Sequence, residues 1–271
     1  MITITKNEFK QLAEYVHSHY GIYLKEEKQA LVTGRLQNVL IELNLKNFTE
    51  YYNYIISDKS GKAATLLMNK ITTNHTFFMR ESDHFDYFKN HVLPYLKNSV
   101  KNKDLRIWSA GCSSGEEPYT LAMILDEYFG SEKSFWDTKV LATDISLNVL
   151  ERAINGIYTN EDISVLPALW RNKYFTRKDD KNSVIIDRIK HEVIFRKFNL
   201  TCEIFPFRKK FHVIFCRNVM IYFDMQTKEK LVNAFYDALE YGGYLFIGHS
   251  EALNRDESKF KYVMPSVYRK E

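Results

Sequence analysis

The chain has 271 residues, 45% of them apolar and 27% charged, and 38 Lys and Arg stand against 34 Asp and Glu, for a formal charge of +4. This composition is typical of a folded globular protein and excludes wholesale disorder. Charges of both signs are interleaved, so bulk binding to nucleic acid is not expected. At roughly 150 residues per domain, the length predicts one large domain or two modest ones.

The sequence shows no sign of secretion, membrane insertion or metal binding. It begins without an apolar run of signal-peptide length, and no stretch approaches the roughly 18 apolar residues of a spanning helix. Its three cysteines, Cys112, Cys202 and Cys216, form no CxxC pair, and its eight histidines show no ligand spacing. We therefore expect a cytoplasmic protein with no metal site and no membrane insertion.

The first hundred residues carry apolar side chains at helical spacing. Asn7 is the expected N-cap of a first helix that ends at Gly21, and a second helix is expected over about 25–43. Asn47, with Glu50 three residues later, predicts a start of the capping-box type for a third helix.

A further helix is expected over 62–71, and Ser82 predicts the N-cap of another that ends near Pro94. The pattern therefore indicates a helical N-terminal domain over 1–72. A linker segment and connecting helix are expected over 73–103.

From residue 104 onward, short apolar runs alternate with helical patterns. Strands are expected at 105–110, 139–144, 211–216 and 244–250, and helices at 116–130, 146–154 and 227–243, the last ended by Gly242 and Gly243. Pro118 falls in the first turn of the first of these helices, as is common. The alternation predicts an α/β domain over 104–271 with a parallel sheet covered on both faces, and the tail is expected to add a last strand or hairpin at its edge.

The strand–helix rhythm breaks at about 160–198. Residues 183–198 alternate like paired antiparallel strands and follow a basic, turn-like stretch. We expect this segment to form a small β-subdomain inserted into the sheet domain.

A glycine-containing loop, Gly111–Gly115, lies between a predicted strand and a predicted helix. Such a turn, with free N–H groups at the helix start, suits an anionic or nucleoside ligand. Asp144 ends the next strand, where an acid can hold the two hydroxyls of a ribose.

The NAD fingerprint G-x-G-x-x-G and the P-loop are both absent. The loop does match G-x-S-x-G, so a hydrolase with Ser113 as nucleophile, Asp144 and a later histidine (His191, His212 or His249) is an alternative, and Cys112 is a candidate thiol nucleophile.

The chain resembles the chemotaxis-receptor methyltransferase family (CheR) in six segments, which read in order TTNHTFFMRESDHF, WSAGCSSGEEPYTLAM, ATDIS, FNL, FCRNVMIYF and GHSE. The resemblance runs from about residue 8 to the C-terminus. It implies a Rossmann-like S-adenosylmethionine-dependent methyltransferase sheet with a small antiparallel β-subdomain, preceded by an all-helical N-terminal domain.

The resemblance also implies roles for individual residues. Those expected to contact S-adenosylmethionine are Asn74, Thr76, Arg80, Gly111, Glu116 or Glu117, Asp144, Asn199, Leu200, Arg217 and Asn218. Arg80 and Tyr222 are the expected catalytic residues, and Lys97 is a further candidate for orienting the substrate carboxylate.

Members of this family methylate glutamate side chains on the cytoplasmic helices of chemoreceptors and release S-adenosylhomocysteine. Members that bind a tethering peptide at the receptor's C-terminus carry a Gly-x-Gly element in the β-subdomain, but residues 176–186 contain no glycine. The chain is therefore expected to bind the methylation helices directly, without the tethering peptide and without nucleic acid. A nucleic-acid amino-methyltransferase is an alternative, because Asn218 and Tyr222 faintly resemble the Asn-Pro-Pro-Tyr element, although Val219 and Met220 replace both prolines.

Overall fold

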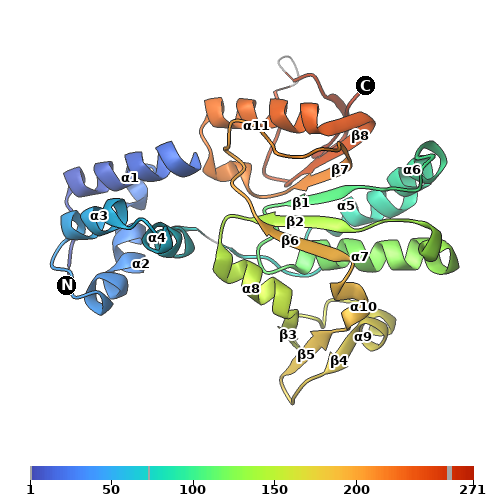
Figure 1. The fold of residues 1–271 in the computed structure, drawn as a ribbon, viewed down its shortest axis with the longest axis horizontal. Coiled ribbons are helices and arrows are strands. Elements are labelled where there is room, and N and C mark those ends of the chain that lie inside the picture. Colours follow the sequence, from blue (N-terminus) through green and yellow to red (C-terminus); the bar gives the residue numbers. More distant parts are fainter. Residues whose placement is uncertain (1, 73, 255–257) are drawn as a thin grey trace.

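The computed structural model describes residues 2–72, 74–254 and 258–271. The N-terminal residues form the helices α1 (Lys6–Tyr20), η1 (Glu26–Lys28), α2 (Gln29–Glu42), α3 (Phe48–Ser57) and α4 (Lys62–Ile71). Figure 1 shows these helices gathered to one side of the sheet. Their buried face is continuous with the core beneath α11 (Met225–Ala238), so the helical domain packs directly on the rest of the molecule.

Capping residues set both ends of α1 and the start of α3. Gly21 ends α1 with a φ of 67°, and the Asn47 side chain accepts a hydrogen bond from Glu50 N, so both predictions are confirmed. The prediction that Asn7 caps α1 was wrong, because Asn7 lies inside the helix. Thr5 is the N-cap, and Glu8 three residues later completes a capping box with it.

The connecting helix consists of α5 (Ser82–Tyr87), a π-helical turn η2 (Phe88–Val92) and α6 (Leu93–Ser99). Ser82 is the first helical residue rather than the N-cap, which is Glu81. Pro94 does not end the helix, contrary to the sequence-based expectation. It falls in the first turn of α6, directly after the π-helical turn, where the regular ladder is already interrupted and its missing N–H costs little.

The central sheet has the strand order β6-β2-β1-β7-β8-β10-β9. Its strands are β1 (Ile107–Ala110), β2 (Val140–Asp144), β6 (Val193–Lys197), β7 (Phe211–Cys216), β8 (Leu239–Ile247), β9 (Lys261–Met264) and β10 (Val267–Arg269). The first five in spatial order pair in parallel, and β10 runs antiparallel to β8 and β9 as an edge hairpin. Every residue of the central strands β1 and β7 is buried, as expected when helices cover both faces.

The helices α7 (Glu116–Phe129), η3 (Gly130–Phe135) and α8 (Leu147–Asn155) follow β1 and β2. The helices α5, α6 and α7 share one buried cluster with the sheet, and α11 packs in another. Gly242 and Gly243 do not end α11, which stops at Ala238; they lie in β8, beside an irregular register between β7 and β8. A Cβ on Gly243 would lie 3.0 Å from the His212 carbonyl oxygen, so the strands approach too closely there for a side chain.

A small antiparallel sheet of order β3-β5-β4 is formed by β3 (Ile157–Thr159), β4 (Phe175–Arg177) and β5 (Asn182–Ile185), with α9 (Ala168–Tyr174) and α10 (Asp187–Lys190) beside it. Figure 1 shows it below the central sheet. The expectation that 193–197 pairs within this subdomain was wrong, because these residues form β6 and run parallel to β2 in the central sheet. The predicted fold class, an α/β sheet with a small antiparallel sheet and a helical N-terminal domain, is confirmed. No helix among the described residues is long and apolar enough to cross a membrane.

Candidate cofactor cleft

A cleft opens at the carboxyl ends of β1, β2 and β7, where parallel sheets usually bind ligands. The linker covers it from one side, and Tyr20 and Ile22, at the end of α1, form part of its wall. The cleft therefore lies at the junction of the N-terminal helices and the sheet.

Nearly all the predicted site residues meet in this one cleft. They are Asn74, Thr76, Arg80, Gly111, Glu117, Asp144, Asn199, Leu200, Arg217, Asn218 and Tyr222. Glu116 does not line it; its carboxylate is buried on the other side of the helix start and accepts a 2.9 Å hydrogen bond from Ser114 Oγ. Lys97 also lies outside, on α6, where it pairs with Glu132 at 2.7 Å.

The Gly111–Gly115 loop is held tightly against the end of β2. The backbone N–H groups of Gly111 and Cys112 donate to the Thr143 carbonyl oxygen at 2.8 and 2.9 Å. Gly111 has a φ of 87°, and a Cβ there would lie 2.4 Å from a Val219 methyl, so both conformation and space require glycine. Ser113 Oγ donates to the Asn74 carbonyl oxygen at 2.9 Å and thereby ties the loop to the linker.

Asp144 closes the loop from the strand end. Its Oδ2 accepts from Ser113 N and its Oδ1 from Ser146 N, each at 2.9 Å. Burial raises the pKa of this carboxyl, although the backbone N–H groups partly oppose the shift. A carboxylate fixed in this way at the cleft wall suits the paired hydroxyls of a ribose.

Arg217 lies almost fully buried between two carboxylates. Its guanidinium donates to Glu81 Oε2 and to Glu117 Oε2, both at 3.0 Å, and stacks 5.1 Å from the centre of the Phe85 ring. Glu117 also accepts from Ser109 Oγ at 2.7 Å. One guanidinium and two carboxylates leave a net charge of −1 beside the cleft, which favours a cationic ligand.

Asn218 is held by residues that the sequence analysis did not assign. Its φ is 59°, its Nδ2 donates to Glu81 Oε1 at 3.1 Å, and its backbone N–H donates to Glu251 Oε2 at 3.0 Å. Burial alone would raise the pKa of the Glu81 carboxyl, but Arg217 and Asn218 outweigh burial and hold that pKa below its ordinary value. Glu81 and Glu251 lie within the family segments TTNHTFFMRESDHF and GHSE, and nothing else in the sequence pointed to either residue.

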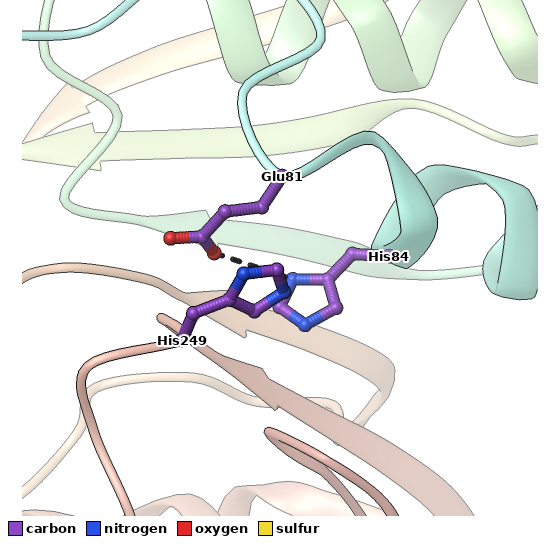
Figure 2. A group of neighbouring side chains, drawn as sticks. All are labelled: Glu81, His84 and His249. Atoms are coloured by element: carbon purple, nitrogen blue, oxygen red, sulfur yellow. Dashed lines mark ion pairs between the residues drawn. The ribbon is translucent and has the colours of Figure 1, made fainter.

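Glu81, His84 and His249 form the cluster drawn in Figure 2, with one potential ligand atom from each within 4.8 Å of the others. Burial lowers the pKa of His84 to about 4, so its 3.5 Å contact with Glu81 is not an ion pair at neutral pH. Both Glu81 oxygens already accept hydrogen bonds from the Arg217 and Asn218 side chains. The Glu81 carboxylate is therefore engaged by Arg217 and Asn218, and we assign no metal to the cluster.

The hydrolase alternative is not supported by the contacts of Ser113, His212 or His249. Ser113 Oγ bonds to a backbone carbonyl, while His212 Nδ1 accepts from Arg106 N at the start of β7, and His249 lies 3.1 Å from Asp83. No triad is thus assembled around Ser113 by these groups. Burial raises the pKa of the Cys112 thiol well above its ordinary value, which argues against a thiolate nucleophile there.

The end of α1 and the residues after it form hydrogen bonds with Tyr222 and Asn199. Tyr23 N donates to the Tyr222 carbonyl oxygen at 2.8 Å, and Asn199 Nδ2 donates to the His19 carbonyl oxygen at 2.9 Å. The helical domain therefore contacts two of the predicted site residues directly.

The fold and the cleft define an S-adenosylmethionine-dependent methyltransferase, and comparison with known proteins agrees. Residues 74–268 match the family model described as the CheR methyltransferase, SAM binding domain, and residues 7–72 match the CheR methyltransferase, all-alpha domain. The chain therefore belongs to the CheR methyltransferase family.

Named relatives place this family in chemotaxis. The chain is 45% identical over 272 residues to a chemotaxis protein methyltransferase of Borreliella burgdorferi, covering 99% of this chain and 96% of that one. It is 33% identical to the chemotaxis protein methyltransferase of Escherichia coli, covering 98% and 92%. Among solved structures, the methyltransferase domain of bacterial CtHen1-C has a TM-score of 0.34 at 16% identity, covering 59% of this chain and 62% of that one. The prediction of S-adenosylmethionine-dependent methylation in chemotaxis is confirmed.

Proposed function

We propose that this protein transfers the methyl group of S-adenosylmethionine to glutamate side chains of chemoreceptors in the cytoplasm, forming methyl esters and S-adenosylhomocysteine. The observation that carries the proposal is that one cleft gathers the linker, the Gly111–Gly115 loop, Asp144 and the Arg217–Tyr222 segment. These come from separate elements, and the family resemblance implies a contact with this cofactor for each of them.

The residues of the cleft fit the parts of this cofactor. Asp144 would accept hydrogen bonds from the ribose hydroxyls, and Asn199 and Leu200 would border the adenine. Arg217 and Asn218 would lie at the methyl-donor end, where the net negative charge of the Arg217 group suits a sulfonium. The remaining contacts would come from Asn74, Thr76, Arg80, Gly111 and, of the two adjacent acids, Glu117 rather than Glu116.

The bound cofactor would supply a methyl group on positively charged sulfur. A glutamate carboxylate is ionised at neutral pH, since its ordinary pKa is about 4.3, so this chain need not supply a general base. Its task is to align and desolvate two oppositely charged groups. Tyr222 and Arg80, both in the cleft wall, are the side chains that would orient the substrate carboxylate.

We infer further that the substrate docks through its methylation helices and not through a C-terminal tethering peptide. The turn between β4 and β5 lacks the Gly-x-Gly element of tethering relatives. Instead, Asp179 Oδ1 closes the turn by accepting from Lys181 N and Asn182 N, each at 2.8 Å. A receptor truncated at its C-terminus would then be methylated as fast as the intact receptor, and a tenfold slower rate would contradict this.

The activity is tested by incubating the protein with S-adenosylmethionine carrying a labelled methyl group and with receptor-containing membranes from its host. We expect label on a receptor-sized band that mild base releases as methanol. Receptors with glutamine in place of the methylated glutamates are the control and should stay unlabelled. A base-stable product would contradict ester formation and favour methylation of an amine.

A further inference from the structure

Glu251, in the turn after β8, lies behind the segment that carries Arg217, Asn218 and Tyr222. Its Oε2 accepts from Gly248 N at 2.6 Å and from Asn218 N at 3.0 Å, and its Oε1 accepts from Ile221 N at 3.1 Å. A single carboxylate thus joins the end of β8 to Asn218, two residues before the short helical turn η4 (Met220–Tyr222), and to Ile221 in the middle of that turn. Hydrogen bonds to a charged acceptor are among the stronger ones in proteins, so these three bonds should hold the segment firmly against the end of β8.

The backbone of Asn218 is left-handed, with a φ of 59°. Asparagine adopts this conformation more readily than most residues other than glycine, and two carboxylates fix it here. Glu251 holds its backbone N–H, and Glu81 Oε1 holds its side-chain amide at 3.1 Å.

Gly248 lies in close contact with Asn218. A Cβ on Gly248 would lie 2.7 Å from Asn218 N and 2.8 Å from Asn218 Cγ. The φ of Gly248 lies outside the left-handed region, so close approach, and not backbone conformation, requires glycine here.

We propose that Glu251 is a positioning residue for methyl transfer: with Gly248, it fixes the placement of Asn218 and Tyr222 relative to the cleft. Glu251 does not itself line the cleft. The proposal rests on the proposed function, because Tyr222 and Asn218 are taken to act at the methyl-donor end. The nucleoside end would be held by Asp144 and Asn199 from other elements, so losing Glu251 should impair turnover more than cofactor binding.

The test variant is Glu251→Gln, which keeps the size of the side chain but turns one acceptor oxygen into an amino group facing backbone donors. With receptor membranes as substrate, we expect kcat to fall at least tenfold while the Kd of S-adenosylmethionine, measured by calorimetry, stays within threefold. The matched control is Glu203→Gln, at an exposed position, and should leave both values unchanged. A kcat within twofold of wild type would overturn the proposal, and so would a Kd that weakens as much as kcat falls.

Gly248→Ala is a second, independent variant. Its methyl group meets Asn218 without forbidding the residue's own backbone angles, so it should show the same split between kcat and Kd, and a kcat within twofold of wild type would count against the proposal. The amide hydrogen exchange rate of residues 217–222 measures how firmly this segment is held, without any activity assay. We expect exchange at least tenfold faster in Glu251→Gln, and unchanged exchange would overturn the proposal. If the wild-type protein labels no receptor, the proposed function falls, and with it the role of Glu251 in methyl transfer. The exchange measurement then still decides separately whether Glu251 fixes residues 217–222.

Discussion

Glu117 accepts a 3.0 Å hydrogen bond from the buried guanidinium of Arg217 at the cleft wall, whereas its neighbour Glu116 turns away and bonds with Ser114. Substitutions of these two adjacent glutamates can therefore be compared, with Glu116 as the control for the effect of Glu117 on cofactor binding. For Glu117→Gln, we expect at least a tenfold loss of affinity for S-adenosylmethionine, about 1.4 kcal/mol, since the net charge beside the cleft falls to zero.

For Glu116→Gln, calorimetry should show affinity within twofold of wild type. Burial raises the pKa of the Glu116 carboxyl, so keeping its charge buried is unfavourable. The neutral glutamine should therefore leave the melting temperature unchanged or raise it. Reversed effects of the two substitutions would show that the assignment of the cleft-facing acid is wrong.

Asp144→Asn should weaken binding of S-adenosylmethionine at least tenfold, because the ribose hydroxyls would face an amide in place of a carboxylate. The fold should persist, since asparagine retains one oxygen to accept from a backbone N–H. Calorimetry measures the affinity and circular dichroism the fold. Asp180→Asn, at an almost fully exposed side chain, is the control. Affinity equal to wild type would disprove the ribose role.

Tyr222→Phe removes a single hydroxyl from the cleft wall. We expect kcat for receptor methylation to fall roughly tenfold to a hundredfold, the scale of lost substrate alignment, with the Kd of S-adenosylmethionine unchanged. Tyr241→Phe, at a side chain 80% exposed, should have no effect on either quantity. A normal kcat in Tyr222→Phe would remove this residue from the proposed mechanism.

Two buried histidines make the free energy of unfolding depend on pH. Burial lowers the pKa of His84 and of His212 to about 4, against about 6.5 in an unfolded chain. As pH falls below 6.5, the unfolded state binds protons that the native state rejects. Each histidine should therefore reduce stability by about 2 kcal/mol at pH 5 relative to neutral pH.

Urea unfolding at pH 7.5 and pH 5 tests this expectation. The comparison of wild type with His84→Gln isolates one histidine, which matters because buried carboxyls with raised pKa, such as that of Glu251, shift stability in the opposite direction. The variant should lose less stability on acidification than wild type. An equal loss in both proteins would contradict a neutral, buried His84.

Local signals in the sequence predicted some helix ends correctly, and failed at Asn7, Ser82, Pro94 and Gly242. Asn47 and Gly21 act within one turn of their own helices, so their effect can be predicted without the fold. The error at 193–197 has a different origin. β6 is the edge strand of the central sheet and is partly exposed, so its residues alternate like an antiparallel strand although it pairs in parallel with β2.

Among the residues of the candidate site, too, some could be predicted from the sequence and others could not. Asp144 was predictable because the end of a parallel strand faces the ligand edge of the sheet. Glu251 was not, since it acts on backbone N–H groups 30 and 33 residues away, a contact that only the folded chain creates. The choice between Glu116 and Glu117 also required the structure, because neighbours on a helix point in different directions.

Because Tyr20 and Ile22 wall the same cleft as Asp144 and Arg217, a molecule that fills the cleft would touch both matched regions of the chain. Thermodynamic reciprocity then couples occupancy of the cleft to association of the two halves. A loaded enzyme should resist separation of its helices from its sheet.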